Sequence, residues 1–329
     1  MYIDEIDEIK TRENAESLKG IFWVKSRANP VYFSAGGGGW RLDLTVGDRT
    51  GEIRLAYFDN DRDSANAKYN SIPKNSIVKV EGKVNIWRDT VSINVGGRSG
   101  GALEIADTDD YDISQFIPKS NQCSDALFRY VQDTINEMAD GPLKELMNLF
   151  IEDPDFVENF KTKPGAIMYH HACKGGLLEH TWEVLSHCKT TVQVHGSLKK
   201  DLVYAGAILH DIGKIREIRV AEGIISTEEG ALLGHIYLTV EMVNEKINGM
   251  VDFPIDIKNR LFHILLSHHE KLEFGSPVKT MTPEAITVAC ADAIGSQVSQ
   301  YIRAVKDAKT DENKFWVRPI GWVFKDALP

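Results

Sequence analysis

The stretch Val203-Tyr204-Ala205-Gly206-Ala207-Ile208-Leu209-His210-Asp211 decides how this chain folds, because an apolar run of helical character ends in an imidazole and a carboxylate. Burying an aspartate at the end of such a run is costly unless a cation or hydrogen bonds compensate its charge. Adjacent helical residues point about 100° apart, so both side chains reach one ion only beyond the helix end. Gly213 is expected to end the helix and permit that geometry. A simple buried His–Asp pair is the competing interpretation.

Three further apolar, helix-like stretches carry polar side chains in the same way. A lone histidine or aspartate in such a stretch is usually a hydrogen-bonded core residue, so each is weak evidence alone. Four stretches that each deliver an otherwise unfavourable buried ligand indicate one metal centre and a hydrolytic enzyme. The three further groups are, in chain order, His180, His268 with His269, and Asp292.

Composition limits the class of protein. The 329 residues are enough for two domains, and 43% hydrophobic with 26% charged residues are usual for a soluble globular protein. No apolar run approaches the roughly 20 residues that span a bilayer, so no membrane partner is expected. The acidic N-terminus lacks a secretory segment, and the four cysteines are scattered without a C-x-x-C pair. We therefore expect a protein of the reducing cytoplasm.

The net charge of −10 by itself argues against a nucleic-acid binder, but its distribution is uneven. Residues 1–16 hold six acids and two bases, whereas residues 17–106 hold 13 bases and nine acids. A basic module attached to an acidic one is compatible with local binding of a polyanion.

Residues 18–105 have the period of β-strands, and the residues beyond Ser124 have the period of helices. Five strand-like runs with one longer connection, at 59–72, suit a Greek-key barrel of the OB type. The run Ala35–Gly39 is expected to form a hairpin tip between the first two strands. The predicted organisation is an acidic segment at 1–16, an OB-fold at 17–106, a linker at 107–123, an all-helical domain at 124–308, and an aromatic tail at 309–329 that packs on the body. The five runs lie at 20–24, 40–46, 52–58, 76–84 and 90–95.

The order His…His-Asp…Asp, with His-Asp followed by Ile-Gly-Lys, resembles the HD-domain superfamily of metal-dependent phosphohydrolases. The resemblance implies that the primary metal ligands are His180, His210, Asp211 and Asp292. It further implies that a second ion is held by His235, His268 and His269.

The stretches 170–181, 230–236 and 267–277 resemble the YhaM-type 3′→5′ exoribonucleases, which pair an N-terminal OB-fold with an HD domain. Residues 42–45 and 47–54 are similar to that family's second and third strands, so the resemblance covers roughly residues 15–325. Two departures stand out. The four-glycine tip from Gly36 to Gly39 replaces a more polar turn, and Glu270 stands where glycine is more usual, which alters the rim of the active site.

Mixed imidazole and carboxylate ligands suit a divalent transition metal better than Mg²⁺ alone. Mn²⁺ is the first choice, Co²⁺, Fe²⁺, Ni²⁺ and Zn²⁺ are alternatives, and one or two ions are expected. In the predicted reaction a metal-activated water attacks a phosphodiester. His210 and Asp211 hold the ion, while His268 and His269 bind a second ion or a non-bridging oxygen. Lys214 either offsets charge on the phosphate or is an exposed helix-end lysine.

Aromatic and basic side chains alternate in the barrel, which is how OB modules bind single strands. At least half of the aromatic residues are expected in the core instead. Trp40 shares the face of Leu42 and is therefore expected in the core, while Arg41 faces outward. The predicted nucleic-acid contacts are the stacking residues Phe33 and Trp87 and the basic residues Lys25, Arg27, Arg41, Arg54 and Arg88.

The function predicted from these residues is a metal-dependent exonuclease on single-stranded RNA, with DNA as a second possible substrate. The 3′→5′ polarity is implied by the resemblance alone. One alternative is an HD phosphohydrolase on small nucleotides, with the barrel used for regulation or assembly. Another is a nucleic-acid-binding protein whose HD site is structural, but such a site would not need His235, His268 and His269 as well. A homo-oligomer is left open.

Overall fold

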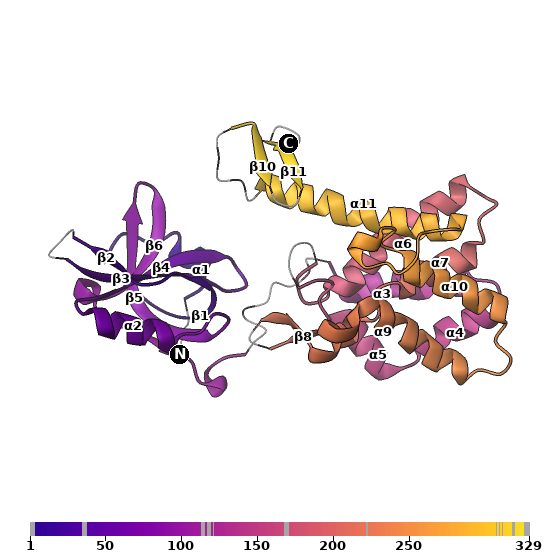
Figure 1. The fold of residues 1–329 in the computed structure, drawn as a ribbon, viewed down its shortest axis with the longest axis horizontal. Helices are drawn as coiled ribbons and strands as arrows, with labels where there is room; N and C mark the ends of the chain where they lie inside the picture. The colour runs from indigo at the N-terminus through magenta and orange to yellow at the C-terminus, as the bar shows by residue number, and fades with distance from the viewer. Residues whose placement is uncertain are drawn as a thin grey trace. The chain divides into compact units, whose positions relative to one another are not determined.

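The computed structural model describes residues 4–34, 38–112, 116, 120, 122–167, 171–221, 223–306, 308, 310, 312–317 and 320–325. The chain divides into two compact units, residues 1–118 with 220–223 and residues 119–219 with 224–329. The first unit is a β-barrel and the second is mainly helical (Figure 1). This confirms the predicted fold class. His170 and residues 35–37 of the glycine-rich tip lie outside the described residues.

Five strands close the barrel. β1 pairs with both β3 and β5, and the path from β3 through β4 and β6 to β5 completes the ring, with β4 and β6 parallel. Two short strands extend it, since β2 pairs with β3 and β7 pairs with β5. The bounds are β1 Ser17–Arg27, β2 Val31–Phe33, β3 Gly39–Gly47, β4 Glu52–Asp59, β5 Ile77–Trp87, β6 Thr90–Gly96 and β7 Ala102–Ile105.

Alternation along the strands separates the core from the outer face. Leu42 and Val46 of β3 and Leu55 of β4 are fully buried. Arg41 and Arg54, at positions of the opposite parity, keep about a third and half of their side chains exposed. Because side chains of a strand point alternately to its two faces, the inner set forms the barrel core and the outer set faces away from it.

Segments that were predicted as separate pack on the barrel. Ile6 and Ile9 of the short helix α1 (Ile6–Ile9) are fully buried in its core, so the acidic segment belongs to this unit. Phe116, within the predicted linker, is 2% exposed and packs with Ile21 and Ile77. The apolar side chains of these segments explain their attachment.

The connection at 59–72 contains a helix, α2 (Arg62–Ser71), that the sequence did not predict. Asp61 caps it by accepting a hydrogen bond from the backbone N–H of Ser64. The segment is polar and buries only Ala65, so it carries no clear apolar stripe. The cap and the contacts of α2 with β3 and β4 compensate for this.

The helical unit is built around α7, in which every residue from Leu202 to Leu209 is buried. A helix that is apolar on all sides is stable only inside a core. Gly206 lets α10 approach closely, since a Cβ there would lie 2.7 Å from Ile264 Cγ2. The helices are α3 Ser124–Asn136, α4 Pro142–Ile151, α5 Pro154–Thr162, α6 Gly176–Val194, α7 Lys200–Leu209, α8 Lys214–Glu217, α9 Glu228–Asn248, α10 Ile255–Ser267 and α11 Pro283–Lys306.

Two small hairpins follow or interrupt the helices, and the first departs from the all-helical expectation for residues 124–308. The first joins β8 (Ile218–Val220) to β9 (Ile224–Ser226), and the second joins β10 (Lys314–Val317) to β11 (Gly321–Phe324). In the second, Val323 is buried, and the hydroxyl of Tyr301 on α11 accepts a hydrogen bond from the N–H of Phe324. β11 thus contacts α11, while the tryptophans Trp316 and Trp322 are about 60% exposed.

Among the helices of the described residues, none combines the length and the apolar character needed to cross a membrane.

Candidate metal centre and barrel face

The polar side chains singled out in the helical unit converge from separate helices. Two of the helices end at the site, because His210 is the C-cap of α7 and His268 is the C-cap of α10. Their rings lie 5.2 Å apart. α7 is buried from Leu202 to its end, and His210 and Asp211 directly beyond it are 0% and 2% exposed. The other members are His180 on α6, His235 on α9, His269 after α10, and Asp292 on α11.

Asp211 lies at the centre of the site. Its Oδ2 is 3.3 Å from His180 Nε2 and 3.4 Å from His210 Nε2. Its Oδ1 is 3.5 Å from His235 Nε2 and 3.6 Å from His268 Nε2. One carboxylate therefore faces two groups of ligand atoms, one through each oxygen.

These two groups form two donor sets. The first donor set is His180, His210 and Asp292, together with Asp211 Oδ2; the second is Asp211, His235, His268 and His269. In the first, His180 Nε2 lies 3.1 Å from His210 Nε2 and 3.2 Å from Asp292 Oδ1. Two nitrogens bound to one ion at about 2.1 Å lie roughly 3.3 Å apart, so the spacing suits a common ion.

Backbone carbonyl acceptors orient three of the imidazoles. Nδ1 of His210 donates to the carbonyl of Ala207 at 2.8 Å, and Nδ1 of His268 donates to that of Leu265 at 2.8 Å. His269 does the same with Phe274. In each ring the Nδ1 proton is engaged, so the lone pair is on Nε2 and faces the site, as metal-ligating histidines require.

The site contains buried polar atoms without a hydrogen bond to any described residue: Asp211 Oδ1, His235 Nε2 and His268 Nε2. Leaving one such atom unsatisfied costs about 1–3 kcal/mol, so three together need a compensating partner. All three belong to the second donor set. A divalent cation satisfies them together, and the residues present therefore fit the metal that an HD domain implies.

The charges of the site are tightly coupled. Burial lowers the pKa of His180, but hydrogen bonds to Asp211 and Asp292 outweigh it and raise the pKa to about 9. Burial raises the pKa of Asp211, but Lys214 and His210 hold it well below its usual range. Burial lowers the pKa of His268 and of His269 and keeps both rings neutral. A neutral imidazole is the form that binds a metal.

Lys214 opens α8 and is not the exposed helix-end lysine of the alternative interpretation. Its side chain is 15% exposed, and its Nζ lies 2.5 Å from Asp211 Oδ2. Burial lowers the pKa of Lys214, but Asp211 outweighs burial and raises it. Lys214 is therefore a largely buried cation beside the first donor set.

Gly213 does not act as expected. The helix α7 ends at Leu209, and Gly213 has an ordinary right-handed φ of −59°. Its lack of a side chain matters for packing instead, because a Cβ would lie 2.1 Å from the carbonyl oxygen of His235. The N–H of Gly213 also donates to Thr239 on α9 at 2.9 Å. Gly213 thus lets α9 bring His235 close to Asp211.

The sequence reasoning missed the residues that hold these ligands in place. Glu217 accepts hydrogen bonds from the backbone N–H of His235, at 3.2 Å, and from its Nδ1, at 3.3 Å. His171 lies between Glu179 and Glu183, and its ring centre is 5.4 Å from that of His180. Glu217 is a single acid on a four-residue helix and gave no signal of its own, whereas His171 and Glu179 lie within the 170–181 stretch quoted for the resemblance.

The barrel brings three of the predicted nucleic-acid residues onto one outer face. The three residues are Arg41 on β3, Arg54 on β4 and Trp87 on β5. Arg54 lies opposite Thr45 of β3 and Ser92 of β6, and Ser92 lies opposite Asn85 of β5. Because alternate residues of a strand share a face, Arg41 lies on the face of Thr45 and Trp87 on the face of Asn85. Trp87 is 69% exposed. We call Arg41, Arg54 and Trp87 the barrel face. Asp43 pairs with both arginines and partly offsets their charge.

The other candidates have different surroundings. Arg27 donates to the carbonyls of Tyr69 and Ile72 at the end of α2, which is a structural role. Lys25 Nζ lies 3.7 Å from the centre of a Trp23 ring. Phe33 contacts Phe58 edge-on at 5.5 Å. Arg88 is exposed in the β5–β6 turn at a φ of +47°.

The prediction that Trp40 is in the core is wrong. Trp40 is only partly buried and contacts Tyr32 and Arg62 outside the core cluster. It precedes Leu42 by two positions, close to the start of β3, where the barrel no longer covers the inward face.

The role of Glu217 can be tested without touching a ligand. Replacing Glu217 by Gln leaves His235 without its charged acceptor, so the second donor set should bind Mn²⁺ about 10–100-fold more weakly while the first is unchanged. Calorimetric titration resolves the two steps. Glu229→Gln, which removes an exposed partner of Arg216, is the control. Equal affinities in Glu217→Gln and the parent chain would contradict the assignment.

The raised pKa of His180 predicts a pH dependence of metal binding. Without an ion the ring is protonated below pH 9, and the ion must displace that proton. Affinity at the first donor set should therefore rise about tenfold per pH unit between pH 7 and 8.5. The dissociation constant measured across this range checks it, with His187→Gln, an exposed change on α6, as the control. An affinity independent of pH would refute it.

Comparison with known proteins agrees with this geometry. The family profile of the HD domain matches residues 177–295, and that of an OB-fold nucleic acid binding domain matches residues 23–97. The 3′-5′ exoribonuclease YhaM of Bacillus subtilis is 30% identical over 307 residues, which cover 92% of each chain. The protein of the same name from Bacillus velezensis is 29% identical, with the same coverage. Similarity at this level along nearly the whole length shows that the chain belongs to the YhaM family of 3′-5′ exoribonucleases.

Proposed function

We propose that this chain is a metal-dependent 3′→5′ exonuclease that hydrolyses the phosphodiester bonds of single-stranded RNA. The observation that carries the proposal is the buried carboxylate of Asp211 facing both donor sets, in a chain that also has an OB barrel. Family membership over nine-tenths of the length supports the same activity.

The two donor sets would each hold one ion, and Mn²⁺ is our first choice because the ligands mix imidazole with carboxylate. A divalent ion so bound makes water a stronger nucleophile and polarises a phosphoryl oxygen. The chain's own residues do the rest. Asp211 holds the two donor sets at a fixed distance from each other. Lys214, whose side chain is largely buried beside Asp211, offsets negative charge on the scissile phosphate.

The barrel would bind the strand upstream of the cleaved end. Arg41 and Arg54 attract phosphates, and Trp87 offers an exposed ring on which a base can stack. Neither contact depends on base identity, so the strand can advance one nucleotide at a time. The four cysteines are all free, in keeping with action in the reducing cytoplasm.

The central test is cleavage polarity and its dependence on Asp211. With Mn²⁺, 5′-labelled single-stranded RNA should shorten stepwise, whereas a 3′ label should leave at once as a mononucleotide. Asp211→Asn should lower kcat on the order of 10³-fold or more, because both donor sets lose the shared charge. Asp133→Asn on the exposed side of α3 is the control. Hydrolysis of free nucleotides with RNA left intact would overturn the proposal.

The barrel face should govern binding rather than chemistry. Trp87→Ala should weaken binding of a single-stranded RNA about 5–100-fold, and Arg54→Ala should also reduce the salt dependence. Fluorescence anisotropy at several salt concentrations measures both effects. Trp322→Ala, an equally exposed tryptophan outside the barrel, is the matched control. The proposed role of the barrel face would be refuted if the Trp87→Ala and Trp322→Ala variants bound the RNA equally tightly.

A further inference from the structure

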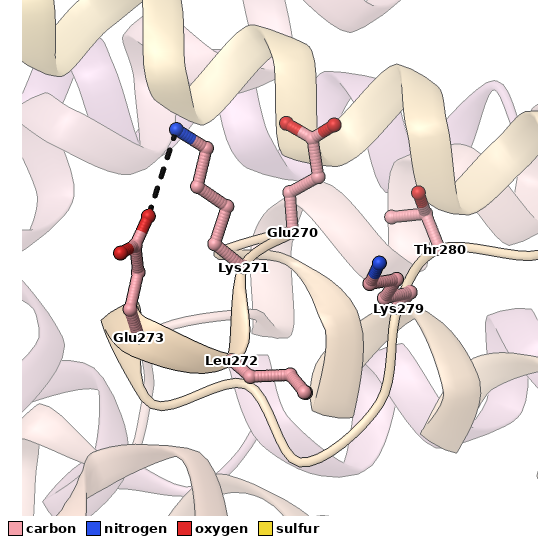
Figure 2. A pocket seen from close by; sticks show the side chains of 6 residues that line it. All are labelled: Glu270, Lys271, Leu272, Glu273, Lys279 and Thr280. Atoms are coloured by element: carbon pink, nitrogen blue, oxygen red, sulfur yellow. Dashed lines mark ion pairs between the residues drawn. The ribbon is translucent and has the colours of Figure 1, made fainter.

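An open pocket is lined mainly by the loop that follows His269, a member of the second donor set. Its volume is about 600 Å³, which is in the range of sites for small molecules. The loop that contributes most of the lining is fixed to this donor set, since His269 donates its N–H to Ser276 Oγ at 3.1 Å and its Nδ1 proton to the carbonyl of Phe274. Figure 2 shows the lining residues Glu270, Lys271, Leu272, Glu273, Lys279 and Thr280.

The charged groups of the pocket are not all neutralised. Lys271 Nζ lies 3.9 Å from Glu273 Oε1, and this pair is drawn in Figure 2. Glu270 and Lys279 make no ion pair with any residue in the described part of the chain. The pocket therefore presents one free carboxylate and one free ammonium group to a ligand.

Glu270 occupies an unfavourable backbone position. Its φ is +62°, a left-handed conformation that glycine adopts readily and a glutamate adopts at a cost. Nothing in the packing of the loop requires a long side chain there, because the residue is exposed. A strained residue that directly follows a candidate metal ligand in the chain points to a functional use of its side chain.

We propose, on the basis of the function proposed above, that this pocket receives the 3′-terminal nucleoside and that Glu270 accepts hydrogen bonds from its 2′- and 3′-hydroxyls. A carboxylate only accepts hydrogen bonds, and the ribose hydroxyls are the donors that all four nucleosides share. The 2′-hydroxyl is also the group that distinguishes RNA from DNA. A 3′-phosphate in place of the 3′-hydroxyl would set its negative charge against the Glu270 carboxylate. Glu270 thus selects RNA ends with free hydroxyls.

Removal of the first nucleotide from three otherwise identical 5′-labelled RNAs tests this selection. One has a normal end, one a 2′-deoxy last residue and one a 3′-phosphate. In the parent chain each change should lower kcat/KM about tenfold. In Glu270→Gly both ratios should fall below about twofold. Glu270→Gln should lose discrimination against the 3′-phosphate yet keep part of that against the deoxy end.

Asp252→Gly is the matched control, because Asp252 is an exposed acid at a φ of +52° in the loop between α9 and α10. Both glycine variants should melt no lower than the parent chain, and Asp252→Gly should keep the parent discrimination. An active Glu270→Gly variant with unchanged ratios would overturn the role of Glu270 alone. A parent chain that degrades none of the three RNAs would overturn the proposed function itself.

Discussion

The carboxylate of Asp211, buried at the end of a helix that is apolar on all sides, is the constraint on which the helical unit depends. Its two oxygens face different imidazoles at 3.3–3.6 Å, so the surrounding helices must end or bend at one point. Such a charge is tolerated in a core only when cations or hydrogen bonds compensate it. Lys214 supplies part of that compensation, and the unsatisfied atoms of the second donor set indicate that metal supplies the remainder.

Two glycines, and the hydrogen-bond acceptors behind the imidazole rings, determine the geometry of this metal centre. Gly213 allows α8 and α9 to approach, and the kink at Gly234, where φ is +73°, directly precedes His235. Glu217 and the carbonyls of Ala207 and Leu265 then fix which nitrogen of each ring faces inward. The loop beyond His269 is held by the same ligand, because His269 donates hydrogen bonds to Phe274 and Ser276.

The residues of the site were predictable because they break the apolar pattern of their own helices. His210 and Asp211 stand out at the end of seven apolar or small residues, and motif spacing links them to His180 and Asp292. Glu217 and His171 carry no such signal, because their importance depends on which distant residue they contact. Trp40 was misjudged since strand alternation predicts which side a residue faces, but not how far along the strand the core extends. The polar helix α2 likewise depends on its cap and neighbours rather than on a stripe of its own.

Anomalous diffraction from crystals grown with Mn²⁺ tests the central claim most directly, because it locates each ion without relying on activity. The account predicts two peaks on opposite sides of the Asp211 carboxylate, roughly 3.5–4 Å apart, one among the first donor set and one among the second. A single peak, or ions bound away from Asp211, would contradict it.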